Sequence, residues 1–507
     1  MNSIIILGVV LLCTAAVFIR ASKKCRKLPL LPSPPADPLI GHLRIFPDTQ
    51  VIGETFHAWS LKYGDIFSLR VPGKTIVVLN TEKAAYDLLE KRSAIYSDRI
   101  PIGYHDAIGW SDGIIHAPYG PFHNQQRKMY HDTLGKNVVS EYRTIQEREA
   151  NTLLQGLLDK PKDFDRHALR FSGGIIAEVG YGHRIDSFDD EFFSIGERFL
   201  KFSNAATTPS LLDLHPAFAY LPSWAPGAWF VEFIKETKPV TDTIIHDNYQ
   251  KVVDQMKAGM ARPSFIATHL EAMHGRERDP EKERALKLAA GMIFAAGFET
   301  TWHTVTILIA ALLLHPEVQQ RAQKEIDEVI GRNRLPDLND RESLPYVQCV
   351  INEVSRWQPV VPVGVPHRLM VDDIYNGMFI PKGSIIVANT RGMTWDEKRF
   401  HDPQQFKPER FLPKPEGAGE VFPMHAVFGW GRRICPGQHL AEGSFWTAAT
   451  RILAVFTIAP MKDAMGKAVK LDIEFESVLI RHPKPFKCDI RPRDERARKL
   501  ILDSCQD

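Results

Sequence analysis

Cysteine is scarce in this chain, and its spacing excludes sites that need cysteine pairs. The 507 residues contain 6 cysteines, at positions 13, 25, 349, 435, 488 and 505. None of them forms a CxxC pair, so neither a multi-cysteine metal site nor a dithiol redox motif is predicted. A chain of this length can bury a sufficient core without disulfides. We therefore expect reduced cysteines in a protein that faces the cytosol.

An excess of charge of either sign is also missing. Lys+Arg 63 against Asp+Glu 61 leaves a net charge of +2, whereas nucleic-acid-binding proteins are usually strongly basic. We therefore expect no nucleic-acid partner. A composition of 44% hydrophobic and 24% charged residues excludes a disordered chain and a polytopic membrane protein. We find no internal repeat, no low-complexity tract, and no G-x-G-x-x-G or P-loop pattern, so no fused nicotinamide or flavin domain is predicted.

One long apolar run is present, at the N-terminus. Residues 4–19 (IIILGVVLLCTAAVFI) are almost entirely apolar, and five basic residues follow within positions 20–27. The run is a little shorter than the ~20 residues that usually span a bilayer. A cleaved signal peptide would carry its cations before the run, so we favour an uncleaved membrane anchor over residues 1–20, with the rest in the cytosol. Prolines at 29, 32, 34, 35 and 38 then predict a semi-rigid hinge over residues 21–41.

Residues 42–507 are predicted to form one large domain that is mainly α with a minor β-sheet region. Residues 66–80 alternate in the manner of a β-hairpin, and residues 372–390 and 470–490 read as short strands. Helical periodicity dominates from 81 to 350 and resumes after 436.

The longest predicted helix has Asp279 as its N-cap and Pro280 as its first residue, and continues to His315. At about 36 residues and ~54 Å, it must cross the interior of a large domain. Its centre, AAGFETT at 295–301, is unexpectedly polar. Gly297 lets another group approach the backbone, Thr300 can bond to a carbonyl and bend or open the turn, and a buried Glu299 needs a partner. By itself, such a polar kink is more often structural than catalytic.

The sharpest signal is the segment FGWGRRICPG at 428–437. Two glycines predict a tight loop, Arg433 adds a cation, and a helix follows Cys435. A cysteine near a cation and a helix N-terminus has its pKa lowered towards the thiolate. A nucleophilic cysteine needs a neighbouring base, and the local candidates for such a base are poor. A single thiolate ligand, in contrast, suits haem iron.

Together with three further motifs, this segment resembles the cytochromes P450. The pattern F-x-x-G-x-R-x-C-x-G is matched by Phe428, Gly431, Arg433, Cys435 and Gly437. The oxygen-activating motif [AG]-G-x-[DE]-T-[TS] is matched at 296–301, E-x-x-R by Glu353 and Arg356, and P-E-R-F at 408–411. The resemblance covers the whole chain. It implies the cytochrome P450 fold, preceded by a single N-terminal transmembrane helix, and haem b as the cofactor.

The resemblance also implies a role for each matched residue. Cys435 would be the axial thiolate ligand of the iron, with Gly431 and Gly437 letting backbone N–H groups approach the sulfur and Phe428 covering the proximal face. Glu299 and Thr300 would relay protons on the distal side. The remaining motif residues, Glu353, Arg356 and Arg410, would form a buried charge cluster that supports folding and takes no part in catalysis.

The haem propionates need cations. Family members place one in a W-x-x-x-R helix; here the matching stretch has His123 in place of the tryptophan and retains Arg127. His367 and Arg433 complete the predicted set, with Arg368 a less suitable neighbour of His367. Gly297 is expected to contact the cofactor. Phe294 and Phe298 are expected to line the substrate pocket.

Family membership would also imply partners and a location. The chain is expected to be a monomer in the endoplasmic reticulum membrane, to receive electrons from NADPH–cytochrome P450 reductase, and to use Arg432 in docking. Sequence segments such as LLEKRSAIYSDR and YLPSWAPGAWF resemble those of fungal secondary-metabolite enzymes of the O-methylsterigmatocystin oxidoreductase and tryptamine hydroxylase kind. They suggest O2-dependent hydroxylation of an aromatic, indole or terpenoid metabolite. The alternative is a non-hydroxylating haem-thiolate isomerase or dehydratase, or a haem-based ligand sensor.

Overall fold

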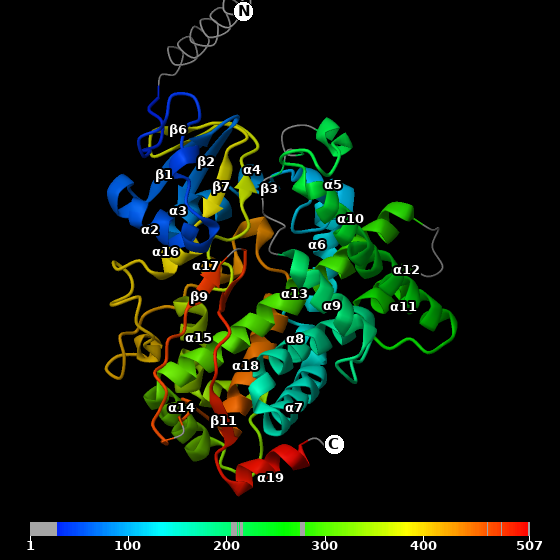
Figure 1. Cartoon of the computed structure of the whole chain (residues 1–507), viewed down its shortest axis with the longest axis vertical. Helices are drawn as coiled ribbons and strands as arrows, with labels where there is room; N and C mark the ends of the chain where they lie inside the picture. The colour runs from blue at the N-terminus through cyan, green and yellow to red at the C-terminus, as the bar shows by residue number, and fades with distance from the viewer. Residues whose placement is uncertain are drawn as a thin grey trace, which may run out of the picture.

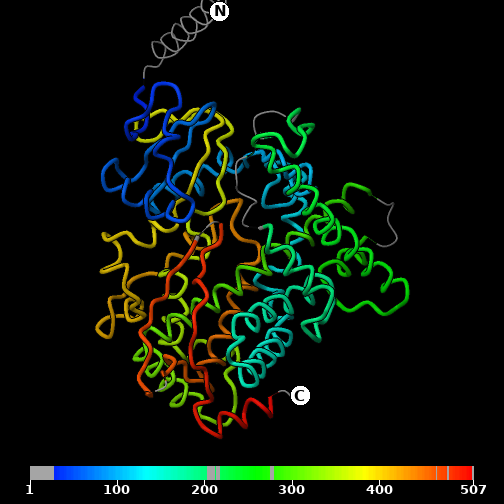
Figure 2. Tube along the Cα trace, viewed as in Figure 1, coloured from blue at the N-terminus to red at the C-terminus, as the bar shows by residue number. Residues whose placement is uncertain are grey.

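The computed structural model describes residues 28–203, 210, 212, 216–273, 279–463, 465–477 and 479–504. The predicted anchor over residues 1–20 and the first part of the predicted hinge, residues 21–27, lie outside the described residues. Figure 1 shows a small β-rich region, coloured blue and yellow, next to a larger helical region. The first described residues and the last lie at opposite ends of the molecule (Figure 2).

The main sheet has five strands in the order β1-β2-β7-β4-β3. The predicted hairpin is present as β1 (Ile66–Val71) and β2 (Lys74–Leu79), which pair antiparallel from Ile66↔Leu79 to Val71↔Lys74. Strand β7 (Ile385–Ala388) runs parallel to β2. The short strands β3 (Asp98–Arg99) and β4 (His367–Arg368) complete the sheet, and they place Arg99 directly opposite His367.

The remaining strands form three antiparallel pairs. A hairpin of β5 (Asp373–Tyr375) and β6 (Met378–Ile380) turns at Gly377, which has φ of +75°. In the C-terminal region β9 (Phe475–Ser477) pairs with β10 (Arg481–Pro483), and β11 (Asp489–Pro492) pairs with β8 (Phe456–Ala459). The strands predicted within 372–390 and 470–490 are therefore confirmed.

The described part of the predicted hinge is fastened to the domain. The carbonyl of Pro29 accepts from the Phe379 N–H at 2.9 Å, and the carbonyl of Pro32 accepts from the Ser68 N–H at 2.8 Å. Leu31 is buried in the same cluster as Tyr375. Proline has no N–H to donate but keeps its carbonyl, so this segment can still bond to strand edges. The folded domain thus includes residues 29–41, which were predicted to be a spacer.

Helices make up most of the remaining ordered elements of the described chain. They are α2 (Ile52–Tyr63), α3 (Glu82–Ala85), α4 (Ser93–Tyr96), α5 (Gly103–Ile108), α6 (Pro121–Leu134), α7 (Arg143–Asp159), α8 (Phe164–Tyr181), α9 (Glu191–Ser203), α10 (Trp229–Asp242), α11 (Asn248–Lys257), α12 (Phe265–Met273), α13 (Pro280–Leu314), α14 (Pro316–Val329), α15 (Pro345–Trp357), α16 (Thr390–Thr394), α17 (Met424–Phe428), α18 (Gln438–Val455) and α19 (Glu495–Asp503).

Helix α13 is the predicted long helix and forms the centre of the core. The Asp279 side chain caps it by accepting from the N–H groups of Glu281 and Lys282. Among the described residues, α13 is the one helix long and apolar enough to cross a membrane, but 67% of its most apolar window is buried inside the domain. The Thr300 hydroxyl donates to the Ala296 carbonyl at 2.9 Å, as predicted. The helix nevertheless continues unbroken from Pro280 to Leu314, so the predicted opening of the turn is not present.

Candidate functional site

The loop before α18 holds Cys435. Its backbone N–H donates to the Phe428 carbonyl at 2.7 Å, which closes the turn. Gly431 has φ of +53°, and a Cβ there would lie 2.2 Å from the Leu89 carbonyl oxygen, so only glycine fits. The Gly431 N–H donates to the Glu90 carboxylate at 2.6 Å. The N–H of Gly431 is therefore directed to Glu90, whereas the Gly437 N–H bonds to the thiol.

The electrostatics of Cys435 differ from those predicted. Burial raises the pKa of the Cys435 thiol, and the Gly437 N–H and Arg127 oppose this effect only in part. The cation that acts on the thiol is Arg127, and Arg433 is directed elsewhere. A bound metal cation would deprotonate such a thiol outright. The site therefore fits a metal-ligating cysteine better than a free reactive one.

Two segments far apart in sequence each hold a residue that is solvent-accessible although the segment lies in the interior of the domain. Ala296 is exposed although Ile293 and Ala295, on the same helix, are buried. Cys435 keeps partial accessibility although protein surrounds its thiol. A residue deep in a domain can be accessible only where it borders internal space. We infer that the face of α13 that carries Ala296 and the half-buried Thr300 borders such space.

Three guanidinium groups near this loop, those of the buried Arg99 and Arg433 and the partly buried Arg127, donate only to carbonyl oxygens among the described residues. Arg433 donates to the carbonyls of Ser97, Ile114 and Ala117 at 2.7 to 2.8 Å. Arg99 donates to those of Ile115, Val365 and Pro366 at 2.6 to 2.9 Å. Arg127 donates to the Ile434 carbonyl.

No acid among the described residues forms an ion pair with Arg99, Arg127 or Arg433. Burial lowers the pKa of Arg433 to about 10, and burial together with the neighbouring Arg433 lowers the pKa of Arg99. The nearby Asp98 is bound to Arg368 at 2.8 Å. Buried charges are normally paired, so this cluster lacks an anion.

Two buried histidines lie near these arginines. His367 Nδ1 is 2.7 Å from the Tyr96 carbonyl oxygen, so Nδ1 carries the proton. Burial, followed by Arg99, holds the pKa of His367 well below its usual value. Burial also lowers the pKa of His123 to about 4, and its enclosed Nε2 has no hydrogen-bond partner among the residues that the structure describes.

Haem fits this set of residues. Its propionates would supply the anion that the arginines lack, and Cys435 would ligate its iron. The structure brings together the predicted residues His123, Arg127, His367, Arg433 and Cys435, and it adds Arg99. Arg368, which was predicted to be a less suitable partner for a propionate, is partly exposed and bound to Asp98.

Sequence reasoning missed Arg99, which no motif contains. Its burial depends on three segments that converge on it: β4, residues 113–117 and residues 365–366. The pairing of β3 with β4 places Arg99 opposite His367, and this position identifies Arg99 as a member of the cluster.

Replacing Arg99 by methionine should weaken haem retention by about 10- to 100-fold, because a charge-assisted hydrogen bond contributes about 1.5–3 kcal/mol. The rate of haem transfer to an acceptor protein measures this effect. Arg368→Met is the matched control, since Arg368 pairs with Asp98 and should leave retention unchanged. Equal retention in the two variants would show that Arg99 does not face the cofactor.

The predicted distal pair is present on α13. Glu299 is 6% exposed, and its Oε1 lies 3.6 Å from Nε2 of His303, which is the partner that its burial required. Among the described residues no hydrogen bond joins Glu299 to the Thr300 hydroxyl, which bonds to the Ala296 carbonyl. Sequence reasoning did not identify His303, although it lies one helical turn after Glu299.

Three further predictions for α13 need correction. A Cβ on Gly297 would lie 2.3 Å from Cδ1 of Ile176, so the group that approaches this backbone is helix α8. Phe294 and Phe298 are fully buried and stack on each other at 5.3 Å. They pack against phenylalanines of α9, including Phe192 and Phe193. Both rings therefore belong to the core and do not line a pocket.

The predicted charge cluster is confirmed. Glu353 and Arg356, on α15, are fully buried and joined by hydrogen bonds of 2.7 and 2.8 Å. Arg410, from the short 3-10 helix Pro408–Phe411, donates to Glu353 at 3.0 Å. The cluster joins α15 to this later segment.

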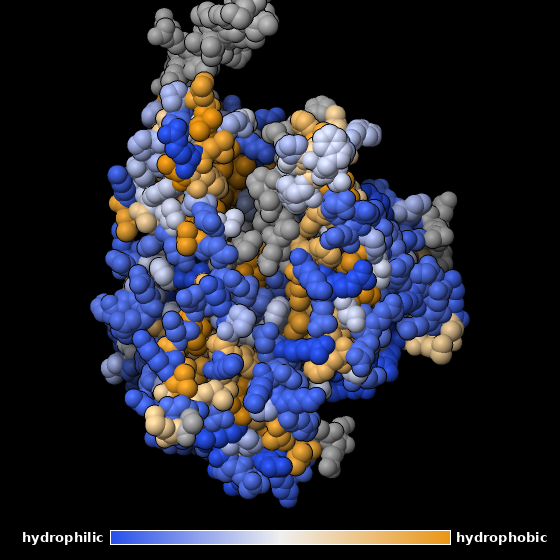
Figure 3. Space-filling model, in the orientation of Figure 1, coloured by the Kyte–Doolittle hydropathy of each residue, from blue (hydrophilic) through white to orange (hydrophobic). Residues whose placement is uncertain are grey.

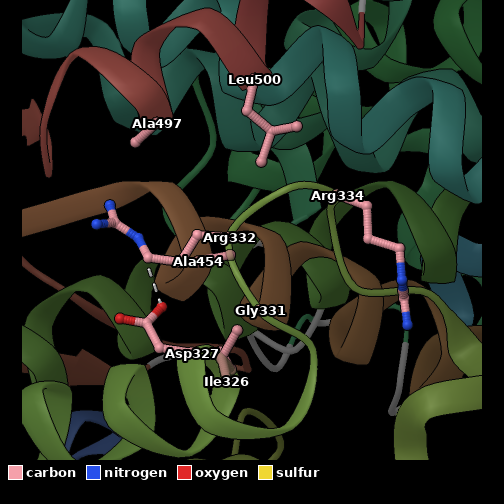
Figure 4. A pocket seen from close by; sticks show the side chains of 8 residues that line it. All are labelled: Ile326, Asp327, Gly331, Arg332, Arg334, Ala454, Ala497 and Leu500. Atoms are coloured by element: carbon pink, nitrogen blue, oxygen red, sulfur yellow. Dashed lines mark ion pairs between the residues drawn. The ribbon is translucent and has the colours of Figure 1, made fainter.

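A small pocket between α14, α18 and α19 lies outside this site (Figure 4). Its Arg332 forms an ion pair with Asp327 at 3.8 Å. Its other lining residues include Ala454, Ala497 and Leu500, which are apolar. We assign it no chemical role.

Comparison with known proteins identifies relatives over nearly the whole chain. The sequence model of the family described as Cytochrome P450 matches residues 31–490. Cytochrome P450 monooxygenase 176 of Postia placenta is 37% identical, over 96% of this chain and 94% of the relative. Cytochrome P450 monooxygenase claR of Ampulloclitocybe clavipes is 35% identical, over 96% and 90% respectively.

Proposed function

Because this chain belongs to the cytochrome P450 family and is a monooxygenase that holds haem through a cysteine thiolate, we propose that it hydroxylates a small, largely apolar secondary metabolite. The observation that carries this proposal is the accessible face of α13 at Ala296 and Thr300, set in an otherwise apolar helix. Aromatic, indole and terpenoid compounds are the substrate classes that we expect.

Residues around this space support an apolar substrate. Ile115 and Val365, whose carbonyls converge on Arg99, are partly exposed and apolar. Polar side chains in a pocket would need partners when an apolar ligand excludes water. Bound haem supplies activation of dioxygen and insertion of one oxygen atom into a C–H bond. The chain's own contribution is to position the substrate above Cys435 and to move protons.

Glu299 and Thr300 are placed to move those protons. The Thr300 hydroxyl lies on the accessible face of α13, where its oxygen can accept a hydrogen bond from a water molecule while its O–H donates to the Ala296 carbonyl. Glu299 can take up a proton on its buried side and return it towards Thr300 through water. This intact acid–alcohol pair favours hydroxylation over an isomerase, a dehydratase or a ligand sensor.

The proposal is tested by supplying the holoenzyme with reductase, NADPH and a panel of apolar metabolites under ¹⁸O2. We expect one labelled oxygen atom in the product. Conversion of a substrate without label, or without any need for O2, would support the alternative chemistry instead.

Electrons are proposed to come from NADPH–cytochrome P450 reductase at the cysteine side. Arg432 supports this, because it is exposed and immediately follows Gly431 of the cysteine loop. Its guanidinium lies 5.2 Å from the ring centre of Tyr119, which holds it in place. A monomer in the endoplasmic reticulum membrane is the expected state.

Exposed apolar side chains support a membrane-facing surface at the end where the described chain begins. Leu39 is 82% exposed, and Leu43 and Ile45 are exposed beside it. Figure 3 shows apolar surface gathered next to the first described residues. The loop before α10, with Trp224 82% exposed, lies at the same end of the molecule (Figure 1).

We expect Trp224 to enter the lipid headgroup region, as aromatic side chains do at membrane interfaces. In vesicles that contain a quenching lipid, full-length protein should lose part of its tryptophan fluorescence, and Trp224→Ser should lose much less. The buried Trp430 provides the control, because Trp430→Phe should leave the amount of fluorescence lost to the quencher unchanged. Equal quenching of wild type and Trp224→Ser would place this loop away from the membrane.

A further inference from the structure

A second cluster of aromatic and titratable side chains extends from Glu299 away from Thr300. His303 is 3% exposed, and it follows Glu299 by one helical turn on α13. The 3.6 Å between His303 Nε2 and Glu299 Oε1 slightly exceeds a hydrogen bond. Catalytic hydrogen bonds are often long in the absence of ligands and shorten in the working complex.

The His303 ring is held between two other rings. Trp302 stacks on it at 3.9 Å between ring centres, and His482 of β10 stacks on it at 4.4 Å, with planes inclined by 15°. Two rings this close and nearly parallel to a third must occupy its opposite faces. The imidazole plane is therefore fixed, and only its edges, where the nitrogens lie, remain to exchange protons.

Both stacking partners reach the surface. Trp302 Nε1 donates to the exposed Asp165 at 2.8 Å. Asp165, Trp302, Glu197 and Lys201 line an open groove of about 510 Å³ between α8, α9 and α13. On the other side His482 Nε2 lies 3.1 Å from Oε1 of Glu476, and both side chains are partly exposed. Water therefore has access close to His303 on the side away from Thr300.

From this arrangement we propose that His303 is a positioning residue that holds the Glu299 carboxylate and passes protons to it from the solvent side. The inference rests on the proposed function, because it concerns the proton supply of the oxygen chemistry. It explains why a histidine is buried on a core helix between Trp302 and His482.

The proton step balances without any further reagent. A hydronium ion of the solvent gives a proton to Nδ1 of neutral His303 and is left as water, while the Nε2–H bond breaks and an O–H bond forms at Glu299 Oε1. The imidazole is again neutral, and the acid can release its proton towards Thr300. The groups facing His303 are Glu299 on its own helix, Asp165 from α8, and His482 from β10, which is backed by Glu476 of β9.

Burial lowers the pKa of His303 below the usual 6.5, although Glu299 opposes this shift. The imidazolium population therefore grows only as the pH falls below about 6.5. Proton supply through His303 should increase in that range and decrease as the pH rises. Glutamine at position 303 keeps a donor towards Glu299 but cannot titrate, so this pH dependence should vanish.

The test uses the full-length haem protein without substrate. NADPH oxidation with reductase is measured from about pH 5 to 8, in H2O and in D2O. We expect His303→Gln to slow oxidation by about tenfold or more, to flatten the pH profile and to enlarge the solvent isotope effect. His303→Asn is a second variant should glutamine disturb folding. His315→Gln is the matched control, because His315 lies 3.4 Å from Glu317 just beyond the end of the same helix.

A second readout requires no turnover. Infrared difference spectra of the ferric protein should show a Glu299 carboxyl band that is absent in Glu299→Gln, and the frequency of this band should shift in His303→Gln, because the side chain that holds the carboxyl group has changed. An unchanged band frequency, or an unchanged solvent isotope effect, would overturn the proposal. Since the infrared readout is independent of substrate, it can fail or succeed whatever metabolite the enzyme hydroxylates.

Discussion

A Cys435→His protein is expected to bind haem but to lose its monooxygenase activity completely. The thiolate pushes electron density onto the iron and favours O–O cleavage, which a neutral imidazole does not do. Histidine would also remove the sulfur that accepts the Gly437 N–H. The measurement is the carbon monoxide difference spectrum of the reduced protein, together with product formation. The red-shifted band typical of haem-thiolate proteins should disappear.

The control for this change is another buried cysteine. Cys488 is 6% exposed, and burial raises the pKa of its thiol to about 12, so it should be chemically inert. Cys488→Ala should keep both the thiolate spectrum and the activity. If Cys435→His retained the red-shifted band, the iron ligand would have to be a different residue.

Glu353→Ala should cost about 3–5 kcal/mol of unfolding free energy, because it leaves buried cations uncompensated. Arg356 is fully buried, and without Glu353 it would keep only carbonyl partners, those of Thr394 and Gln405. Domains are stable by about 5–15 kcal/mol, so this single change should remove a large share of the stability. The midpoint of urea unfolding measures the loss.

Two further variants distinguish the cost of an unpaired buried charge from a loss of stability that any substitution could cause. Glu353→Leu combined with Arg356→Met removes both charges and should recover much of the lost stability. Glu328→Ala breaks the exposed pair with Lys324, whose atoms are 3.7 Å apart, and should not shift the midpoint measurably. If Glu353→Ala behaved like Glu328→Ala, the cluster would not hold the fold together.

Local signals in the sequence were sufficient to predict the scaffold. Asp279 and Pro280 define the start of α13 through capping chemistry, which depends only on neighbouring residues. The contact of Glu353 with Arg356 is also local, since one helical turn separates them. The alternation of residues 66–80 likewise predicted β1 and β2, because strand periodicity is a local property.

The residues that sequence reasoning missed depend on tertiary convergence. Arg99 becomes a buried cation only because residues 115 and 365 meet around it. The plane of the His303 ring is fixed only through its stacking on His482 of β10. Phe294 and Phe298 show the same limit, since an apolar ring on a core helix can face either a pocket or another helix. Cys435 was assigned a lowered thiol pKa from nearby charges, but desolvation by the whole fold outweighs them.

The bonds from Pro29 and Pro32 to the sheet leave a short tether. If residues 1–20 span the bilayer as proposed, the chain between residue 20 and Pro29 reaches at most about 30 Å. The enzyme and a membrane-bound reductase would then diffuse within the same thin layer above the lipid. Confinement of this kind raises their effective concentration without any added contact between them. Electron delivery would therefore depend on their density in the membrane and hardly at all on the volume of the cytosol.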